Sequence, residues 1–258
     1  MNREQLLVAF MTIFRKECIR IFRIWPQTIL PSLVTSVLYF LIFGKFLSEK
    51  IGLIGDYSYI QFVIPGLVML GVITSSYMNT AFQFFTQKFF MRSIDELLVS
   101  PMPPWVIIAG FVSGGIARGI MVGLGTLLIA LLFATPVIKH FWVVFIFIFL
   151  TSMASSLAGL VNGVYAKKID GINIVPTFVI TPLVYLGGVF YSISILPPIW
   201  QTLSKINPVF YIVDGLRYGF LGVSDVSIGI SISVLFVISG IFMGINWYLI
   251  RTGLGLKQ

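Results

Sequence analysis

The chain has 258 residues, of which 58% are hydrophobic and 10% charged, and its mean hydropathy is +1.01. Soluble domains have about 25% charged residues, so this composition predicts a membrane protein and excludes an ordinary soluble domain. The net charge of +8 arises mostly from Lys and Arg near the predicted cytoplasmic face, which indicates membrane topology and lipid contact rather than nucleic-acid binding.

The first predicted element is an amphipathic helix at residues 3–25, within an N-terminal segment at 1–26 that Pro26 ends. We expect it to lie in the membrane interface, with its cations toward anionic headgroups. Glu17 falls within the apolar face, and we expect it to face protein rather than lipid. Cations spread along the segment speak against a cleavable signal peptide. Those on the polar face are Arg15, Lys16, Arg20 and Arg23.

Six segments reach the length of about 20 apolar residues that a helix needs to cross a bilayer core of about 30 Å. We expect one transmembrane domain at 27–253. Both termini then lie on one side, and the positive-inside rule places that side in the cytoplasm, with Arg251 and Lys257 in the tail. The predicted spans are 28–47, 60–85, 106–134, 141–165, 172–190 and 228–250.

The loop between the second and third predicted spans, residues 88–101, reads KFFMRSIDELLVSP and has the pattern of an amphipathic helix. Pro101 and the prolines after it close the segment before the third span. Taken alone, the pattern predicts a turn helix that rests on the membrane surface. The apolar face would carry Phe89, Phe90, Ile94, Leu97 and Leu98, and the polar face Lys88, Arg92, Asp95 and Glu96.

Arg118, in the third predicted span, is the only charge deep within a span. An arginine there costs several kcal/mol unless it faces water or a partner. It either pairs within the subunit or lines the route of an anionic headgroup or phosphate. Small residues at four-residue spacing around it allow close helix packing, and they are Gly110, Gly114, Gly115, Gly119 and Gly123.

The segment 181–222, after the fifth predicted span, does not leave the membrane as a plain polar loop. Glycine and proline breaks separate two short apolar helices, predicted at 199–206 and 209–220, which suit a membrane surface or a half-inserted hairpin. We expect its one charged pair to hold this outer cap in place. The breaks and the charged pair are Gly187, Gly188, Pro197, Asn207, Pro208, Asp214 and Arg217.

Catalytic and nucleotide-binding patterns are missing from the sequence. Gly44-Lys45 lacks the rest of a phosphate-binding loop, so any ATP hydrolysis is expected on a separate chain. No Ser-His-Asp set or paired carboxylate is visible, which speaks against a membrane-embedded transferase. The single cysteine and histidine, Cys18 and His140, exclude an internal disulfide and speak against a metal site.

Along nearly its whole length the chain resembles the ABC-2 type transporter permeases, and most closely the YadH-like inner-membrane permeases of Gram-negative bacteria. The longest motif that carries this resemblance consists of Pro182, Tyr185, Gly187, Gly188, Phe190, Leu196, Pro197, Asn207, Pro208, Tyr211, Asp214 and Arg217.

The resemblance implies an all-α membrane fold like that of type V exporters. It has six spans, an N-terminal interfacial helix, a cytoplasmic coupling helix and a re-entrant outer helix pair. It also implies a homodimer in the bacterial inner membrane with two ATPase subunits, which carry ATP and Mg. The run from Glu96 through Leu97, Leu98 and Pro101 matches the coupling helix. The N-terminal helix is then either an anchor or a gate beside the ATPase.

A stand-alone secondary carrier or channel is the alternative function. No predicted span contains Asp or Glu in its core, and ion-coupled carriers generally need such groups, so the sequence favours the permease. An apolar interior with one arginine mildly favours an amphipathic or lipid-like substrate.

Overall fold

The computed structural model describes residues 2–256, apart from the side chains at positions 45 and 194. Lys257, which the topology prediction counted in the tail, lies outside the described residues. Within them, six helical segments are long and apolar enough to cross a membrane, which confirms the number and order of the predicted spans. They are Trp25–Ile51, Tyr59–Phe89, Pro104–Ala130, Phe141–Tyr165, Ile169–Leu186 and Ile228–Thr252.

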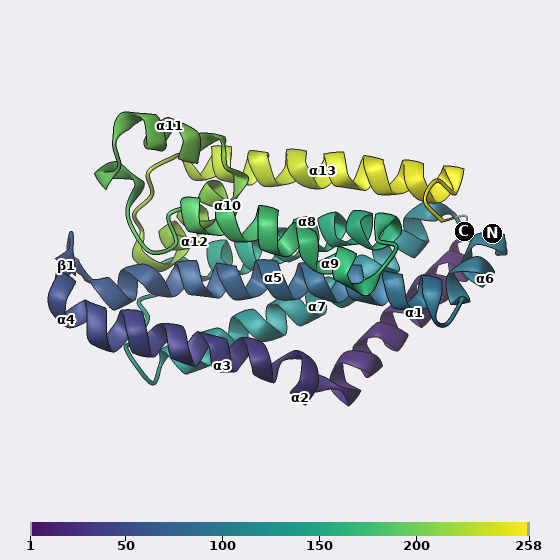
Figure 1. Ribbon diagram of the computed structural model, residues 1–258, viewed down its shortest axis with the longest axis horizontal. Helices are drawn as coiled ribbons and strands as arrows, with labels where there is room; N and C mark the ends of the chain where they lie inside the picture. The colour runs from purple at the N-terminus through teal and green to yellow at the C-terminus, as the bar shows by residue number, and fades with distance from the viewer. Residues whose placement is uncertain (1, 257–258) are drawn as a thin grey trace.

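The N-terminal part is bent. Helix α1 (Arg3–Arg23) lies obliquely and leads into the first span, which begins with a short turn of helix (Figure 1). Pro26 in the first turn of α2 (Trp25–Thr28) and Pro31 in the first turn of α3 (Leu30–Tyr39) explain the breaks. Each lacks the N–H group that would continue a preceding helix. The span runs from 25 to 51 rather than 28 to 47. The elements of this span are α2, α3, the π-helical η1 (Phe40–Leu47) and α4 (Ser48–Ile51).

A small hairpin joins the first two spans. Strands β1 (Leu53–Ile54) and β2 (Tyr57–Ser58) pair antiparallel, with Leu53 opposite Ser58. Gly55 in the turn has a φ of 60°, a conformation that glycine adopts without strain. The expected all-α fold missed this hairpin.

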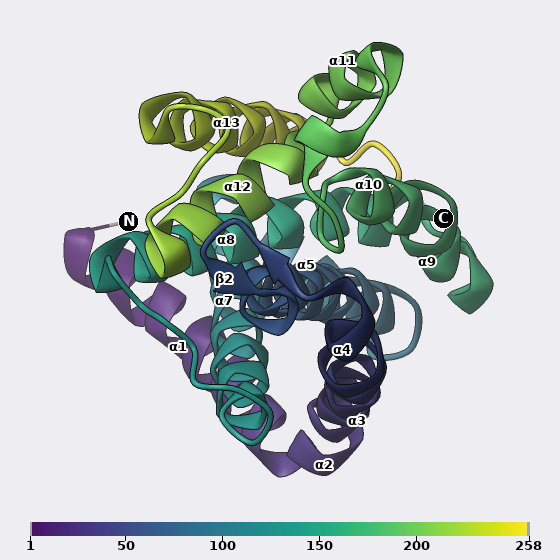
Figure 2. The same cartoon turned by 90° about the vertical axis from the view of Figure 1, so that its left-hand side faces the viewer.

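Helix α5 (Tyr59–Phe89) is the centre of the bundle, as Figure 2 shows. Its most apolar stretch is 78% buried within the protein, because α7 (Pro104–Ala130) and α8 (Phe141–Tyr165) pack on it. The limits of α8 are those predicted. Helix α7 ends at 130 rather than 134, where the chain turns toward α8.

The fifth span is short and irregular. It consists of α9 (Ile169–Val175), the π-helical η2 (Pro176–Ile180) and α10 (Thr181–Leu186), so it covers 169–186 rather than 172–190. The helix ends at Gly187, and Gly188 follows with a φ of 75°. The rest of the chain forms η3 (Ile193–Ile195), α11 (Pro198–Ile206), α12 (Pro208–Leu221) and α13 (Ile228–Thr252), which confirms the two short helices.

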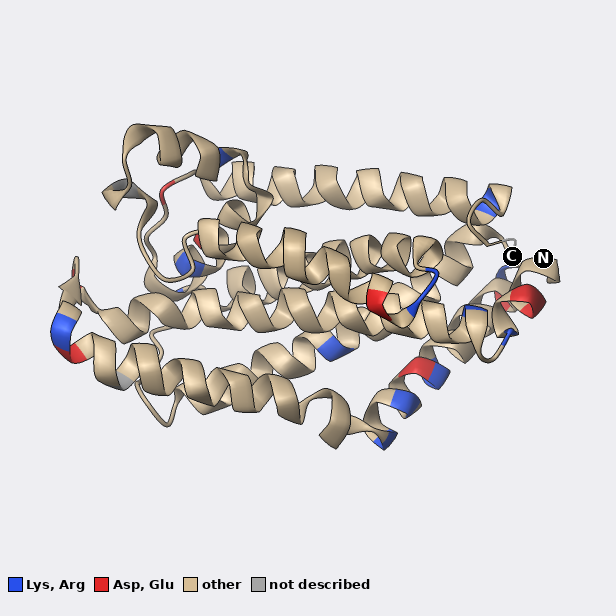
Figure 3. Ribbon diagram, in the orientation of Figure 1, with Lys and Arg blue, Asp and Glu red and all other residues tan. Residues whose placement is uncertain are grey.

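The two ends of the bundle differ in what they carry. The N-terminal end of α1, the C-terminal end of α13 and helix α6 (Ser93–Val99) lie at one end, and α11, α12 and the hairpin lie at the other (Figure 1). Lys and Arg residues gather toward the end with the termini, as Figure 3 shows. We call these the terminal end and the hairpin end.

Candidate functional site

The predicted coupling segment, residues 88–101, contains helix α6. This helix contains only the seven residues Ser93–Val99, because α5 continues through Lys88 and Phe89 before the chain turns. The prediction that Lys88 belongs to an exposed polar face is wrong. Its ammonium group is buried and donates hydrogen bonds to the carbonyl oxygens of Val164 at 2.9 Å and Gly255 at 2.5 Å.

The turn into α6 presents the remaining predicted residues to the outside. Arg92 has a φ of 51°, which redirects the chain after α5. Asp95 and Glu96 are exposed in the first turn of α6, where the helix dipole favours negative charge. Leu98 and Pro101 are also exposed, Leu97 is half-buried, and Ile94 is the residue that anchors α6 in the core.

A groove of about 600 Å³ lies beside α6 at the terminal end. It is lined by Arg92, Asp95 and Leu98 from the α6 region and by Arg251 from the end of α13, together with the buried Lys88. Charged and apolar groups therefore share one surface, as in the rim and core of a protein–protein contact.

Helix α1 packs on α7 with one side and leaves the rest exposed. Its buried side chains are Ile13, Glu17 and Ile21. The close approach depends on Gly114 of α7, because a Cβ atom there would lie 2.9 Å from the Cβ of Glu17. Glu17 therefore faces protein, as expected, and its side chain has no exposed surface. Arg15, Lys16 and Arg23 are exposed on the other side.

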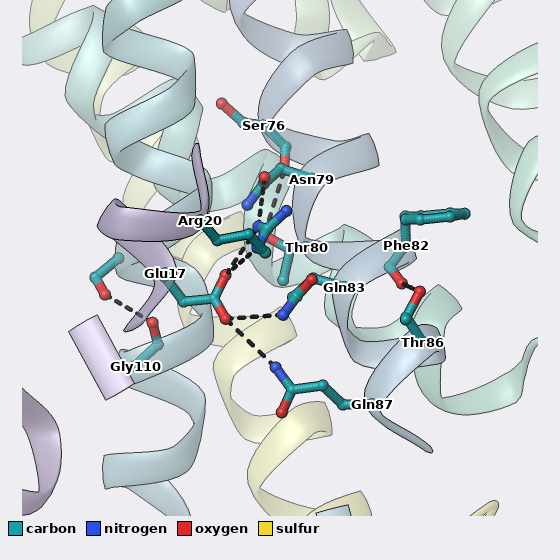
Figure 4. A network of polar contacts seen from close by, with 11 residues as sticks. Glu17, Arg20, Ser76, Asn79, Thr80, Phe82, Gln83, Thr86, Gln87 and Gly110 are labelled. Carbon is teal, nitrogen blue, oxygen red and sulfur yellow. Dashed lines mark hydrogen bonds and ion pairs between the residues drawn. The ribbon is translucent and has the colours of Figure 1, made fainter. Parts of the chain in front are cut away.

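A network of polar side chains surrounds the carboxylate of Glu17, as Figure 4 shows. Arg20 forms an ion pair with it at 2.8 Å and also donates a hydrogen bond to Asn79 at 2.9 Å. Gln83 and Gln87 donate hydrogen bonds to the other carboxylate oxygen at 3.0 and 3.4 Å. These contacts join α1 to α5 and satisfy a charge that burial would otherwise make very costly.

Sequence reasoning missed Gln83 and Gln87. Together with Asn79 they recur every four residues along α5, so they lie on one face of that helix. This spacing of amides inside an apolar span, read beside an acidic residue on an apolar helix face, was the signal that could have found them.

Arg118 is held within the subunit. Its Nη2 atom donates a hydrogen bond of 2.5 Å to the carbonyl oxygen of Thr28, at the end of α2 where the first span bends. Such a carbonyl has lost its partner in the broken helix, so the arginine satisfies it. Its Nε atom is buried without a hydrogen-bond partner.

Helix α12 carries the predicted charged pair of the segment 181–222, and both side chains are buried. Asp214 and Arg217 contact the main chain rather than each other. The carboxylate of Asp214 accepts hydrogen bonds from the backbone N–H groups of Asp225 at 2.8 Å and Val226 at 3.2 Å. Burial raises the pKa of Asp214, and these two hydrogen bonds oppose that rise.

Arg217 donates a hydrogen bond of 2.7 Å to the carbonyl oxygen of Gly188, and its guanidinium group lies 3.9 Å from the centre of the Phe62 ring. Asn207 caps the start of α12 by accepting from the N–H of Val209, and its amide group donates to Leu183. The last helical turn of the fifth span and the glycine pair after it are therefore bonded to the start and the middle of α12, respectively. Helix α11 begins after Pro197 and exposes its apolar side chains, among them Ile199 and Ile206.

Comparison with known proteins identifies the family. The sequence profile of the family described as "ABC-2 type transporter" matches residues 8–221. The chain is 51% identical to the inner membrane transport permease YadH of Escherichia coli K12 over 252 residues, which are 97% of this chain and 98% of that protein. The chain belongs to the ABC-2 type transporter family.

More distant relatives also align with most of the chain. Nodulation protein J of Neorhizobium galegae is 22% identical over 93% of this chain and 92% of that protein. Nodulation protein J of Rhizobium meliloti is 23% identical over 88% and 86%. Their similarity thus extends over most of the chain rather than over one motif.

This ABC-2 protein is therefore a transmembrane permease. Permeases of this family lack ATPase activity, which resides in a separate subunit. Within residues 2–256, no group of three His, Cys, Asp or Glu side chains is arranged to hold a metal ion.

Proposed function

We propose that two copies of this permease form the pathway of an ATP-driven exporter and that two ATPase subunits dock on its terminal end. ATP and Mg would be bound by those subunits. Both termini would lie in the cytoplasm of a bacterium, with residues 1–26 as an interfacial segment and 27–253 as the transmembrane domain. The cations at the terminal end support this orientation.

The single observation that carries the docking proposal is the exposed surface of α6. Asp95, Glu96 and Leu98 point outward from a short helix that Ile94 anchors in the core. Motion of a docked subunit can therefore reach the bundle through a rigid element. The groove that continues to Arg251 provides further charged contacts at the same end.

Two spans support the proposal of a second copy. Only 18% of the most apolar stretch of the first span and 11% of that of the fifth are buried within the protein, against 78% for α5. The first and fifth spans lie on the same side of α5 in Figure 2. We place the partner copy against this side. Membrane lipid would surround the rest of the bundle, including α13, which is also mostly exposed.

The remaining predicted residues have roles within this proposal. Helix α1 is a gate rather than a passive anchor, because the buried Glu17 and the half-buried Arg20 connect it to α5. Its exposed cations contact lipid headgroups. Arg118 holds the bend of the first span and does not line the substrate route. Helices α11 and α12 form a re-entrant cap over the outer exit.

Charge reversal on α6 tests the docking. In the variant Asp95→Lys with Glu96→Lys, we expect binding of the ATPase subunit to weaken by at least about tenfold, because complementary contacts become like-charge contacts. The measurement is co-purification of the two subunits from membranes, followed by titration of the purified permease with the ATPase.

The matched control is Glu49→Lys with Asp56→Lys. It reverses two exposed carboxylates at the hairpin end and should leave ATPase binding unchanged. Equal binding of the wild type and the α6 variant would refute docking at α6.

A further inference from the structure

The carboxylate of Glu17 belongs to an unbroken chain of contacts that ends on α6. Gln87 donates its Nε2 hydrogen to Glu17 at 3.4 Å, and its Oε1 atom accepts a hydrogen bond from the hydroxyl of Ser93 at 3.2 Å. Ser93 is the first residue of α6. One amide side chain thus contacts both the buried charge of α1 and the start of the proposed docking helix.

Water cannot replace these contacts without unpacking the helices. Glu17 has no exposed surface, Gln87 is 1% exposed and Gln83 is 6% exposed. A buried carboxylate needs its hydrogen-bond donors, and hydrogen bonds strengthen in surroundings of low polarity. Gln87 is therefore constrained to follow Glu17 when either helix moves.

The connection between α5 and α6 is short and has a defined shape. Only Phe90, Met91 and Arg92 separate the two helices, and Arg92 adopts the left-handed conformation there. The Ser93–Gln87 hydrogen bond closes this turn. A displacement of α6 consequently acts on the Gln87 side chain rather than being absorbed by a long loop.

We propose that Gln87 and Ser93 are positioning residues that transmit displacement of α6 to α1 through Glu17. This inference rests on the proposed docking of the ATPase subunit at α6. It adds that α1 is moved by α6 through specific side chains, and not only by movement of the whole bundle.

The test uses the native cysteine of α1 as a reporter in the complete complex with the ATPase subunit. Cys18 is half-buried and adjacent to Glu17, so displacement of α1 changes its access to reagent. We measure its rate of maleimide modification, on the permease band, without nucleotide and with ATP plus vanadate. The variants are Ser93→Ala and Gln87→Leu, and the control is Ser100→Ala.

Ser100, directly after α6, is a matched control because its hydroxyl donates a hydrogen bond to the carbonyl oxygen of Leu97, outside the relay. We expect the nucleotide-dependent change in rate to persist in the wild type and Ser100→Ala. It should shrink by at least about threefold in Ser93→Ala and Gln87→Leu, although the ATPase subunit stays bound. Ser93→Ala removes only a half-exposed hydroxyl, so its result stands even if Gln87→Leu fails to fold.

The same nucleotide-dependent change in all variants would overturn the relay but leave docking intact. A wild type that retains the ATPase subunit yet shows no change at Cys18 would also overturn the relay. Failure of the wild type to bind the ATPase subunit would instead refute the proposed function, and the relay with it.

Discussion

Two pairs of an acid and an arginine, at identical spacing, lie at the two ends of the molecule and behave differently. Glu17 and Arg20 on α1 form an ion pair at 2.8 Å and bind side chains of α5. Asp214 and Arg217 on α12 each bind main-chain groups instead. The three-residue spacing permits an ion pair on a helix, but the surroundings decide whether one forms.

The difference follows from what each helix must satisfy. Helix α12 is enclosed by α5, α8 and α13, next to loops whose backbone groups lack partners of their own, and its charged side chains supply them. Helix α1 packs mainly on α7, and its polar partners are amide side chains. Helix α12 is packed on three helices, whereas α1 is joined to α5 through side chains and keeps one side exposed. We therefore regard Asp214 and Arg217, the α12 pair, as structural, and Glu17 and Arg20, the α1 pair, as part of a moving element.

The largest difference is expected when the two arginines are removed. Arg217→Met leaves the Gly188 carbonyl without its donor inside a closely packed region, and we expect a loss of about 3 kcal/mol in the free energy of unfolding. Arg20→Met should cost about 1 kcal/mol. Its side chain is 22% exposed, and Gln83 and Gln87 still donate hydrogen bonds to the other carboxylate oxygen of Glu17. Thermal unfolding of both purified variants measures the difference.

Limited proteolysis separates local loosening from global unfolding. Arg20→Met should be cleaved faster within α1 and nowhere else, whereas Arg217→Met should be cleaved faster throughout. Equal losses of stability in the two variants would remove the distinction between the α12 pair and the α1 pair.

Substitution of Asp214 tests how much the acidic residue of the α12 pair contributes to stability. Asp214→Leu leaves the N–H groups of Asp225 and Val226 without an acceptor and should cost about 2 kcal/mol more than Asp214→Asn, which keeps one acceptor. Chemical unfolding at neutral pH checks this order. Equal stability of the two variants would show that the two hydrogen bonds contribute little.

The pH dependence gives an independent readout of the same residue. Burial raises the pKa of Asp214, so the folded state binds its proton more tightly than the unfolded state. Its contribution to stability is therefore fully present below the ordinary carboxyl range and is lost as the pH rises through the folded-state pKa. Asp214→Asn should lack this decline, and an identical pH profile in both proteins would contradict the assignment.

The sequence predicted the spans well where they are regular and poorly where proline or glycine acts. The limits of α8 are those predicted because its apolar run has polar or charged residues at both ends. The fifth span ends early at Gly187, and the first span is bent at Pro31 and contains a π-helical stretch. The sequence prediction missed these features because breaks in the backbone do not alter hydropathy. The two-residue strands near Gly55 are too short to have a periodicity.

Side-chain partners were less predictable than helices. The acidic residue on the apolar face of α1 indicated a protein contact, but the identity of its partners depends on how α1 packs against α5 and α7. Lys88 was predicted on the polar face of the loop helix. Because α5 continues one turn further than predicted, Lys88 belongs to α5 and is buried. Asp214 looked like the partner of Arg217 because sequence spacing contains no information about nearby backbone groups.

The smallest expected effect concerns Cys18, next to Glu17 of the α1 pair. Burial raises the pKa of its thiol, and the carboxylate of Glu17 raises it further. In Glu17→Gln the second cause is gone, so more thiolate is present at neutral pH and maleimide modification should accelerate by less than about tenfold. Glu4→Gln, on the same helix but remote from Cys18, should not change the rate.

A pH profile distinguishes this electrostatic effect from loosening of α1. A lower pKa shifts the midpoint of the rate curve to lower pH and leaves its upper plateau unchanged, whereas greater exposure raises the plateau. If Glu17→Gln moves only the plateau, the carboxylate acts on Cys18 by holding α1 in place. A shifted midpoint with an unchanged plateau would instead mean that α1 keeps its packing on α7 without the charge, so that the amide contacts are sufficient to position it.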